Sequence, residues 1–320
     1  MQILDNSLRD QIGETFVSQK QFSEQLRKSE YKERLQILKR FEEVFRASFD
    51  EMYEAAAKDF CRPKTEVDMT EIMVVLSELA IVRKNLKKWM KPKKVLPTLL
   101  LFGTSSQIIK EPKGVTLIIS PWNYAFNLTF NPMISAIAAG NTVIIKPSEH
   151  SPNMSRVIEK IVSDSFESKH VSIFQGDSSV AEHLTNMPFD HIFFTGSPEI
   201  GKHVMSAAAK NLSSVTLELG GKSPVVIHES ADLEKAADAI VFSKFLNNGQ
   251  TCIAPDYILV QNAVSDKFLE QIKRSISKRS TISGSPTSGI LTRCARGSAR
   301  PPTTDDRGSK SRAQSQKFRL

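Results

Sequence analysis

The sequence predicts an α/β protein built on a doubly wound parallel sheet and followed by a second, smaller α/β unit. Five short apolar runs rich in β-branched residues lie at 115–120, 142–146, 171–175, 191–195 and 214–219. Because these runs are continuously apolar rather than alternating, they are typical of strands that helices cover on both faces. Helical segments are expected between them, near 127–139, 151–166, 178–185 and 198–210. This alternation of strand and helix predicts parallel pairing within one sheet.

The region before the first strand predicts helices. Residues 1–28 have weak helical patterning, whereas from Leu35 to Met52 apolar side chains recur every three or four residues, as on one face of a long helix. A second amphipathic helix runs from Ile72 to Trp89 and is expected to end before Pro92. Both apolar stripes are interpreted as core. Two extended segments are expected next, at 99–103 and 106–112.

The second unit is expected to hold a strand, a helix, a bend, a strand and a final amphipathic helix. These fall at 223–228, 231–245, around Cys252, at 257–261 and up to Lys278. Residues 279–320 are rich in Ser, Thr, Arg, Gly and Pro and are expected to be disordered, because they bury too little apolar surface to offset the ordering entropy. The predicted division is therefore 1–217, 218–278 and a basic tail over 279–320.

Charge and composition favour a globular protein without a specific nucleic-acid partner. The net charge of +8 lies almost entirely in residues 279–320, which hold nine Lys or Arg and two Asp, so the remaining chain carries +1. The three cysteines are too few for a disulfide framework, and no Cys–His cluster suggests a metal. The N-terminus has no secretory pattern, and no apolar run approaches the roughly 20 residues that span a bilayer. A cytoplasmic protein is the expectation.

Cys252 lies in a small, polar and flexible setting, directly after Gly249, Gln250 and Thr251. Such a setting suits a thiol on an exposed bend, where backbone amides stabilise a thiolate. A buried structural cysteine normally has bulky apolar neighbours instead. Since a lone cysteine is more often structural than catalytic, the residues alone leave both interpretations open.

Glu218 ends the fifth predicted strand, beside a glycine pair and 34 positions before Cys252. Carboxylates act as general bases at sites that bury them. A strand-end carboxylate that caps local amides is the commoner case, and it stays open as the alternative.

Three further groups follow predicted strands, where ligands of parallel sheets bind. Lys146 and Glu149 form a cation and carboxylate pair that suits ribose hydroxyls, although a solvated strand end is the simpler alternative. Gly196, Ser197 and Gly201 open a helix in a GxxxxG spacing, which suits a pyrophosphate or is an ordinary helix cap. Asn123 is either an amide donor to an oxyanion or a turn residue.

The motifs ELGGKSP and GQTCIAP resemble those of the aldehyde dehydrogenase superfamily. PWNY, IIKPSE and FTGSPEIG stand upstream in the order of that family, and GQTCIAPDYIL is similar to its class 3, or fatty-aldehyde, branch. The resemblance covers about residues 10–278 and implies NAD(P)-dependent oxidation of aldehydes to carboxylic acids. It also implies a Rossmann-like NAD domain followed by an α/β catalytic domain.

The resemblance implies a role for each motif residue. Cys252 is the nucleophile that forms a thiohemiacetal and then a thioester, Asn123 completes the oxyanion hole with the Cys252 amide, and Glu218 activates water. Lys146 and Glu149 hold the adenosine ribose, with NAD as the first choice and NADP possible, and Gly196, Ser197 and Gly201 form the nucleotide turn. The segment 99–112 is expected to pair subunits in a homodimer.

The chain also departs from the family pattern. Ala125 stands where a proline is common, and no EIFGP motif, whose Glu holds the nicotinamide ribose, occurs anywhere in the sequence. The pattern stops near Lys278, which predicts an incomplete catalytic domain and motivates the hypothesis of a frameshift or false gene end. Low or absent turnover is expected, and a non-catalytic nucleotide-binding remnant is the alternative function.

Overall fold

The computed structural model describes residues 5–281 and 317–319, and the chain divides into two compact units. Unit 1 comprises Met1–Ala55 and Val67–Leu219, and unit 2 comprises Ala56–Glu66 and Gly220–Leu320. The division after Leu219 falls two residues beyond the expected one. In addition, a segment of the N-terminal helical region, 56–66, belongs to unit 2.

Unit 1 is organised around a five-stranded parallel sheet. Its strand order is β5 (Val171–Ile173), β4 (Thr142–Lys146), β3 (Val115–Ile119), β6 (His191–Gly196) and β7 (Ser214–Leu219). All four strand pairs are parallel, and Ile119 at the end of β3 lies opposite Lys146 of β4 and Phe194 of β6. The chain winds outward from β3 to β5 and then returns to place β6 on the other side of β3. The predicted doubly wound sheet is confirmed.

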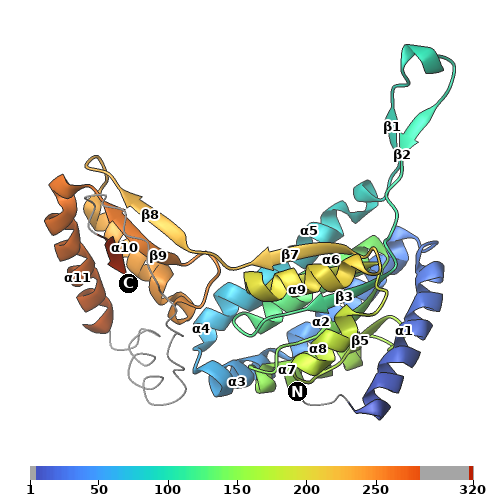
Figure 1. The fold of residues 1–320 in the computed structure, drawn as a ribbon, viewed down its shortest axis with the longest axis horizontal. Helices are drawn as coiled ribbons and strands as arrows, with labels where there is room; N and C mark the ends of the chain where they lie inside the picture. Colours follow the sequence, from blue (N-terminus) through green and yellow to red (C-terminus); the bar gives the residue numbers. More distant parts are fainter. Residues whose placement is uncertain (1–4, 282–316, 320) are drawn as a thin grey trace. The chain divides into compact units, whose positions relative to one another are not determined.

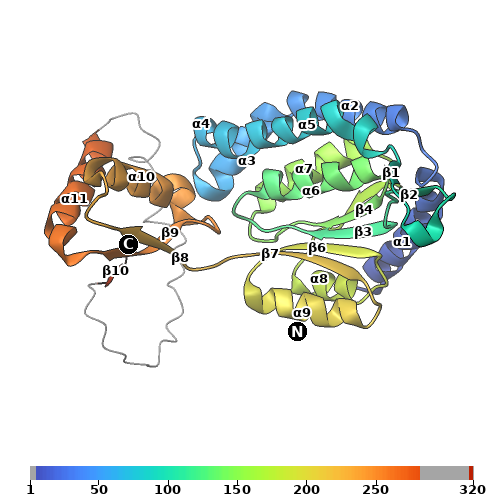
Figure 2. The same cartoon turned by 90° about the horizontal axis from the view of Figure 1, so that it is seen from above.

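Helices cover both faces of this sheet (Figures 1 and 2). One face carries α6 (Ala125–Ala139) and α7 (Pro152–Ser165), and the other carries α1 (Asn6–Leu26), α8 (Ser178–Thr185) and α9 (Pro198–Ala209). An outer layer of α2 (Tyr31–Ala47) and α5 (Met73–Trp89) packs over α6 and α7. Phe41 of α2 contacts the rings of Phe130 in α6 and Phe166 directly after α7, at centroid distances of 5.3 and 5.8 Å. These contacts join the outer layer to the α6–α7 layer.

The expected long helix over 35–52 is two helices, α2 and α3 (Phe49–Phe60), with a break at Ser48. Ser48 has φ −95° and ψ 3°, and its Oγ donates to the carbonyl of Val44 at 2.9 Å. A serine that bonds the preceding turn offers the backbone an alternative to the helical ladder. The apolar periodicity continues across the break, so periodicity alone did not reveal it.

The segment 93–108 forms a hairpin in which β1 (Lys93–Val95) pairs antiparallel with β2 (Ser106–Ile108). The expected extended structure over 99–103 is wrong, because Leu99–Leu101 is a 3-10 turn, η2. The amides of Leu101 and Phe102 bond carbonyls three residues earlier, and a run of leucines fits such a turn as well as a strand. The side chains of this hairpin tip are largely exposed, including Leu100 at 97% and Phe102 at 88%.

Unit 2 packs two helices, α10 (Leu233–Phe245) and α11 (Ser265–Thr281), against a small sheet. In this sheet β9 (Pro255–Val260) pairs in parallel with β8 (Ser223–Ile227) and antiparallel with β10 (Lys317–Arg319). The core includes Ile240, Ile258 and Phe268. Shorter elements of the chain are α4 (Lys64–Val67), the π-helical η1 (Asp68–Ile72), and the 3-10 turns η3 (Leu246–Gly249) and η4 (Asn262–Val264).

The expected disordered tail over 279–320 lies mostly outside the described residues, which omit 282–316 and 320. Its first residues extend α11 to Thr281. Residues Lys317–Arg319 form β10 instead of disordered chain, because the edge of β9 offers backbone groups for a further strand.

His170 is a buried imidazole in the turn directly before β5 of unit 1. Its ring lies edge-on to Phe22 and Phe166 at centroid distances of 5.6 and 5.8 Å, and its Nε2 has no hydrogen-bond partner among the described residues. Burial lowers the pKa of His170 from 6.5 to about 4, although a backbone hydrogen bond to Asn141 opposes the shift. The folded protein therefore holds this ring neutral at pH values where the unfolded chain binds a proton.

We expect acidification to destabilise unit 1 through His170. A folded-state pKa of about 4 against 6.5 means that stability is lost as the pH falls through this window. At pH 4.5 the loss is about 2 to 3 kcal/mol relative to pH 7. Urea unfolding at both pH values measures it, and His170→Gln should remove that part of the pH dependence. His203→Gln, at an exposed position of α9, is the control, and an unchanged pH dependence in His170→Gln would contradict the assignment.

Candidate active site

The polar candidates of unit 1 gather at the carboxyl edge of the sheet. Lys146 ends β4, Asn123 follows β3, Gly196 ends β6 and Glu218 is the penultimate residue of β7. The β3 and β6 ends flank the point where the strand order reverses, which is where open α/β sheets bind ligands. The parallel topology therefore places four candidate residues at one edge.

Lys146 and Glu149 are in direct contact. Lys146 Nζ donates to Glu149 Oε2 at 2.6 Å, with the lysine side chain only 4% exposed and the glutamate 38% exposed. Burial favours a higher pKa for Glu149, but the hydrogen bond and charge of Lys146 outweigh it and hold the pKa below its ordinary value. The pair thus presents an ionised carboxylate to solvent with a buried ammonium behind it.

The glycine turn after β6 opens α9. Ser197 is the N-cap, its Oγ accepts the Ile200 N–H at 3.3 Å, and Pro198 occupies the first turn. A Cβ on Gly201 would lie 2.8 Å from Leu219 Cδ2, so close packing of α9 on β7 explains this glycine. The geometry is that of an ordinary capped helix, and nucleotide binding by Gly196, Ser197 and Gly201 stays a prediction.

Glu218 and Asn123 differ in exposure. Glu218 lies opposite Thr195 in the β6–β7 ladder and is exposed, whereas Asn123 is half-buried in the connection between β3 and α6. Ala125, where a proline was expected from the resemblance, is the first residue of α6 and is buried. It is accommodated as an ordinary helical position.

Cys252 lies in unit 2, on an exposed bend as its sequence setting predicts. The bend follows η3, in which Asn247, Asn248 and Gly249 have φ of 49°, 55° and 75°. Successive left-handed residues are costly for side chains other than glycine, so surrounding contacts hold this conformation. The structure thus brings Lys146 and Glu149 into contact and leaves Cys252 in a separate unit from them.

A buried ion pair that the sequence analysis missed supports this bend within unit 2. Arg62 Nε lies 3.3 Å from Glu66 Oε1, and the two side chains are 2% and 7% exposed. The backbone N–H of Asn247 donates to the same carboxylate. Burial raises the pKa of Glu66, while Arg62 and the Asn247 N–H oppose the rise. The segment 56–66 is therefore tied to the start of the cysteine bend.

Breaking this pair is expected to destabilise unit 2. Glu66→Gln removes the carboxylate charge that faces the buried Arg62, at a cost of about 3 to 5 kcal/mol. Native-state hydrogen exchange of the Ile258 and Val260 amides in β9 measures the local unfolding free energy. Glu234→Gln, which removes the exposed pair with Lys278, is the control and should cost less than about 1 kcal/mol. Equal effects of the two substitutions would contradict a supporting role for Glu66.

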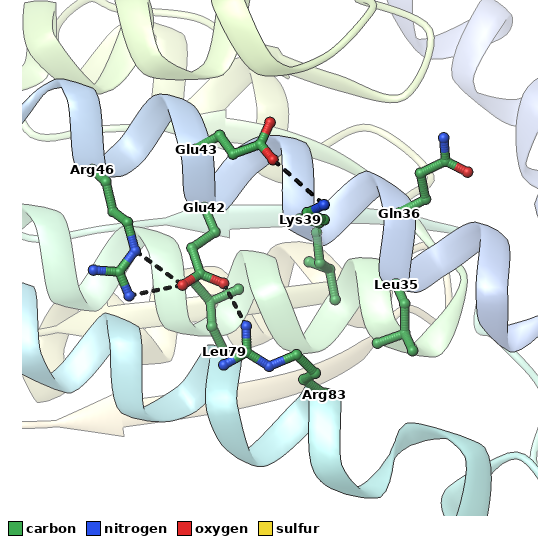
Figure 3. Close-up of a pocket in the computed structure, with 9 residues that line it drawn as sticks. Leu35, Gln36, Lys39, Glu42, Glu43, Arg46, Leu79 and Arg83 are labelled. Atoms are coloured by element: carbon green, nitrogen blue, oxygen red, sulfur yellow. Dashed lines mark hydrogen bonds and ion pairs between the residues drawn. The ribbon is translucent and has the colours of Figure 1, made fainter.

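A cavity of about 480 Å³ lies on the α2–α5 face of unit 1, away from the sheet edge. Figure 3 shows Glu42 between Arg46 and Arg83, which it contacts at 2.8 and 3.0 Å. These charges satisfy one another, and the lining includes no cysteine or histidine. We therefore assign no chemistry to this cavity.

Among residues 5–281 and 317–319, no three His, Cys, Asp or Glu side chains are grouped so as to hold a metal ion. Within the same residues, none of the helices combines the length and apolarity needed to cross a bilayer.

The parallel sheet, its two helical layers and its polar carboxyl edge define a doubly wound α/β protein. Residues 7–288 match the model of the aldehyde dehydrogenase family, and the chain belongs to this family.

Curated relatives agree with the family match. The chain is 43% identical over 265 residues to 4,4'-diaponeurosporen-aldehyde dehydrogenase of Staphylococcus aureus, covering 83% of this chain and 58% of the relative. It is 40% identical over 245 residues to aldehyde dehydrogenase family 3 member A2 of Pongo abelii, covering 77% and 50%. The predicted resemblance to class 3 is confirmed. The chain spans about three fifths or less of the length of these relatives.

Solved structures share the fold. The substrate-bound state of Staphylococcus aureus AldH superimposes with a TM-score of 0.83 at 40% identity, covering 90% of this chain and 61% of that one. A betaine aldehyde dehydrogenase mutant from the same species has a TM-score of 0.77 at 26% identity, covering 85% and 55%. That structure was determined in complex with NAD+ and with a BME-modified cysteine.

Proposed function

We propose that the chain carries the residues for NAD(P)-dependent oxidation of aldehydes to carboxylic acids through Cys252. The observation that carries this proposal is the placement of Asn123, Lys146, Gly196 and Glu218 at one carboxyl edge of a family-typical sheet. The exposed bend at Cys252 supports a nucleophile, because an accessible thiol reacts more readily than a buried one. The substrate class is an aldehyde, as the names of the relatives indicate for those proteins.

In the proposed reaction, the Cys252 thiolate forms a bond from its Sγ to the carbonyl carbon of the aldehyde, and the C=O electron pair moves to the oxygen. Asn123 and the Cys252 backbone N–H donate to the resulting oxyanion; one such donor typically lowers the barrier by about 3 kcal/mol. The C–H bond then breaks with its electron pair, and the carbon remains bound to Cys252 as a thioester. Glu218 takes a proton from water, whose oxygen bonds the acyl carbon. The C–S bond breaks, releasing the acid and the thiolate.

The nicotinamide of a bound dinucleotide supplies the acceptor for the hydride. Lys146 and Glu149 would hold its adenosine ribose, since the solvent-facing carboxylate can accept from hydroxyls while the ammonium donates. Gly196, Ser197 and Gly201 would line the pyrophosphate at the start of α9. NAD is the first choice, because the charge of Glu149 repels a 2′-phosphate.

The preference for NAD over NADP is expected to depend on Glu149. Glu149→Gln removes the negative charge and also a ribose acceptor, so the affinity for NAD should fall while the NADP to NAD affinity ratio rises several-fold. Calorimetric titration of both dinucleotides measures the ratio. Glu167→Gln, an exposed carboxylate paired with Lys169, is the control. A ratio that does not change in Glu149→Gln would rule out this role.

Activity and cysteine dependence are tested in one assay. Because the chain spans about three fifths of its relatives, we expect NADH formation with an aliphatic aldehyde to stay well below about 10 per second. Whatever turnover occurs should vanish in Cys252→Ala and persist in Cys61→Ala, which removes the other exposed cysteine of the described residues. Activity that survives Cys252→Ala would refute the mechanism.

Nucleotide binding without turnover is the second candidate function. It is favoured because the residues proposed to hold the dinucleotide all belong to unit 1, whose five-stranded sheet has helices on both faces. Binding of NAD by wild type, Cys252→Ala and Cys61→Ala, with no turnover in any of them, would support this function over catalysis. If none of these proteins binds NAD, both candidate functions are excluded.

The β1–β2 hairpin supports a homodimer as the proposed assembly. Its exposed side chains include Leu96, Leu99 and Phe102, at 92%, 94% and 88% exposure. Apolar groups of this size in one hairpin are typical of an interface between chains.

A further inference from the structure

Glu71 is a fully buried carboxylate that the reaction proposed above does not use. It lies in η1, the π-helical turn directly before α5, and its exposure is 0%. Its Oε2 accepts the backbone N–H of Phe126 at 2.7 Å and that of Asn127 at 3.2 Å. Single π-helical turns within helices are often found at functional sites.

These two amides belong to the first turn of α6, the helix that follows Asn123. The N-cap residue Tyr124 makes no side-chain capping bond, and the first turn contains no acidic residue. Glu71 therefore acts as a cap from a segment more than fifty residues earlier in the chain. A carboxylate at a helix N-terminus pairs with amides that have no helical partner and with the positive end of the dipole.

Neighbouring bonds fix the connection from β3 to α6 at both ends. At the start, the Ser120 N–H donates to the Lys146 carbonyl at 3.1 Å, and Ser120 Oγ accepts from Thr129 Oγ1 at 2.7 Å. At the end, Asn127 Nδ2 donates to the carbonyl of Thr70, next to Glu71, at 3.1 Å. Only the short stretch 121–125, with Asn123 at its centre, lies between these anchors.

We propose that Glu71 is a positioning residue for Asn123, whose side-chain amide it aims by fixing the amides three and four residues further along. The inference rests on the proposed function only for the role of Asn123 as an oxyanion donor. The positioning itself rests on contacts within unit 1. Leucine at this position removes the acceptor, and glutamine keeps one oxygen but loses the charge and buries an extra NH₂ group.

The structural test uses the full chain and nuclear magnetic resonance. In the wild type, the amides of Phe126 and Asn127 should exchange slowly with solvent despite their place in a first helical turn. In Glu71→Gln and Glu71→Leu, exchange of both should accelerate about tenfold or more, and the side-chain NH₂ signal of Asn123 should shift or broaden. Its assignment comes from its disappearance in Asn123→Ala.

Glu78→Gln is the matched control, because Glu78 contacts α6 at Ser135 Oγ, 3.1 Å away, and lies in an exposed environment. It should change neither the Asn123 signal nor the two amides. Rapid exchange at Phe126 and Asn127 in the wild type would overturn the proposal, as would an unmoved Asn123 signal in a folded Glu71→Gln. If Glu71→Leu does not fold, the glutamine variant and the wild-type exchange rates decide.

A kinetic test separates positioning from general stabilisation. Glu71→Gln should lower kcat about tenfold with little change in KM, and the double variant Glu71→Gln/Asn123→Ala should be no slower than Asn123→Ala alone. A double variant slower by the product of both effects would overturn action through Asn123. If the wild type has no turnover, the proposed function fails, and the exchange rates with the Asn123 signal decide the positioning of Asn123 independently.

Discussion

The pairing of β6 with the side of β3 that β4 leaves open is the interaction on which unit 1 depends. The four backbone register pairs between β3 and β6 bring the chain back across the sheet after it has wound outward to β5. The reversal leaves the connection after β3 and the turn after β6 as neighbours, with Lys146 on one side and Glu218 on the other. Without it, the same residues would end strands at unrelated places.

Much of this arrangement could be predicted from the sequence, because fully buried strands have an unambiguous pattern. Runs such as 142–146 are apolar and β-branched at their centre and too short for helices, and the structure buries all five residues of that strand. Once parallel pairing is inferred, the carboxyl ends share an edge by necessity. The positions of Lys146, Asn123 and Glu218 followed from topology rather than from any single motif.

Other features depend on particular hydrogen bonds, local or distant, and could not be predicted from the apolar pattern. Ser48 breaks a helix through a bond to its own preceding turn, and the leucines after Thr98 form a turn that their composition does not distinguish from a strand. Glu71 offered a signal, since it stands between Val67 and Val75 at helical spacing and so places a carboxylate on an apolar face. Its partners, however, lie on α6 and could not be identified from that spacing.

The buried glutamates Glu66 and Glu71 have the same structural role, although each acts within its own unit. Glu66 accepts the N–H of Asn247 where the chain adopts left-handed conformations before Cys252, and Glu71 accepts the first amides of α6 after Asn123. In both cases a short connection is held by a carboxylate on another segment rather than by its own residues. A connection held in this way keeps a defined backbone conformation. It does not need bulky side chains beside it, which would block access to Cys252 or Asn123.

The tip of the β1–β2 hairpin, by contrast, is held by few contacts. Only three residue pairs join β1 to β2, and the leucines of η2 bury little surface within the chain. Folding of unit 1 therefore places almost no demand on the identity of these side chains. The tip is a place where the sequence can be edited, by a polar loop or a label, without disturbing the sheet.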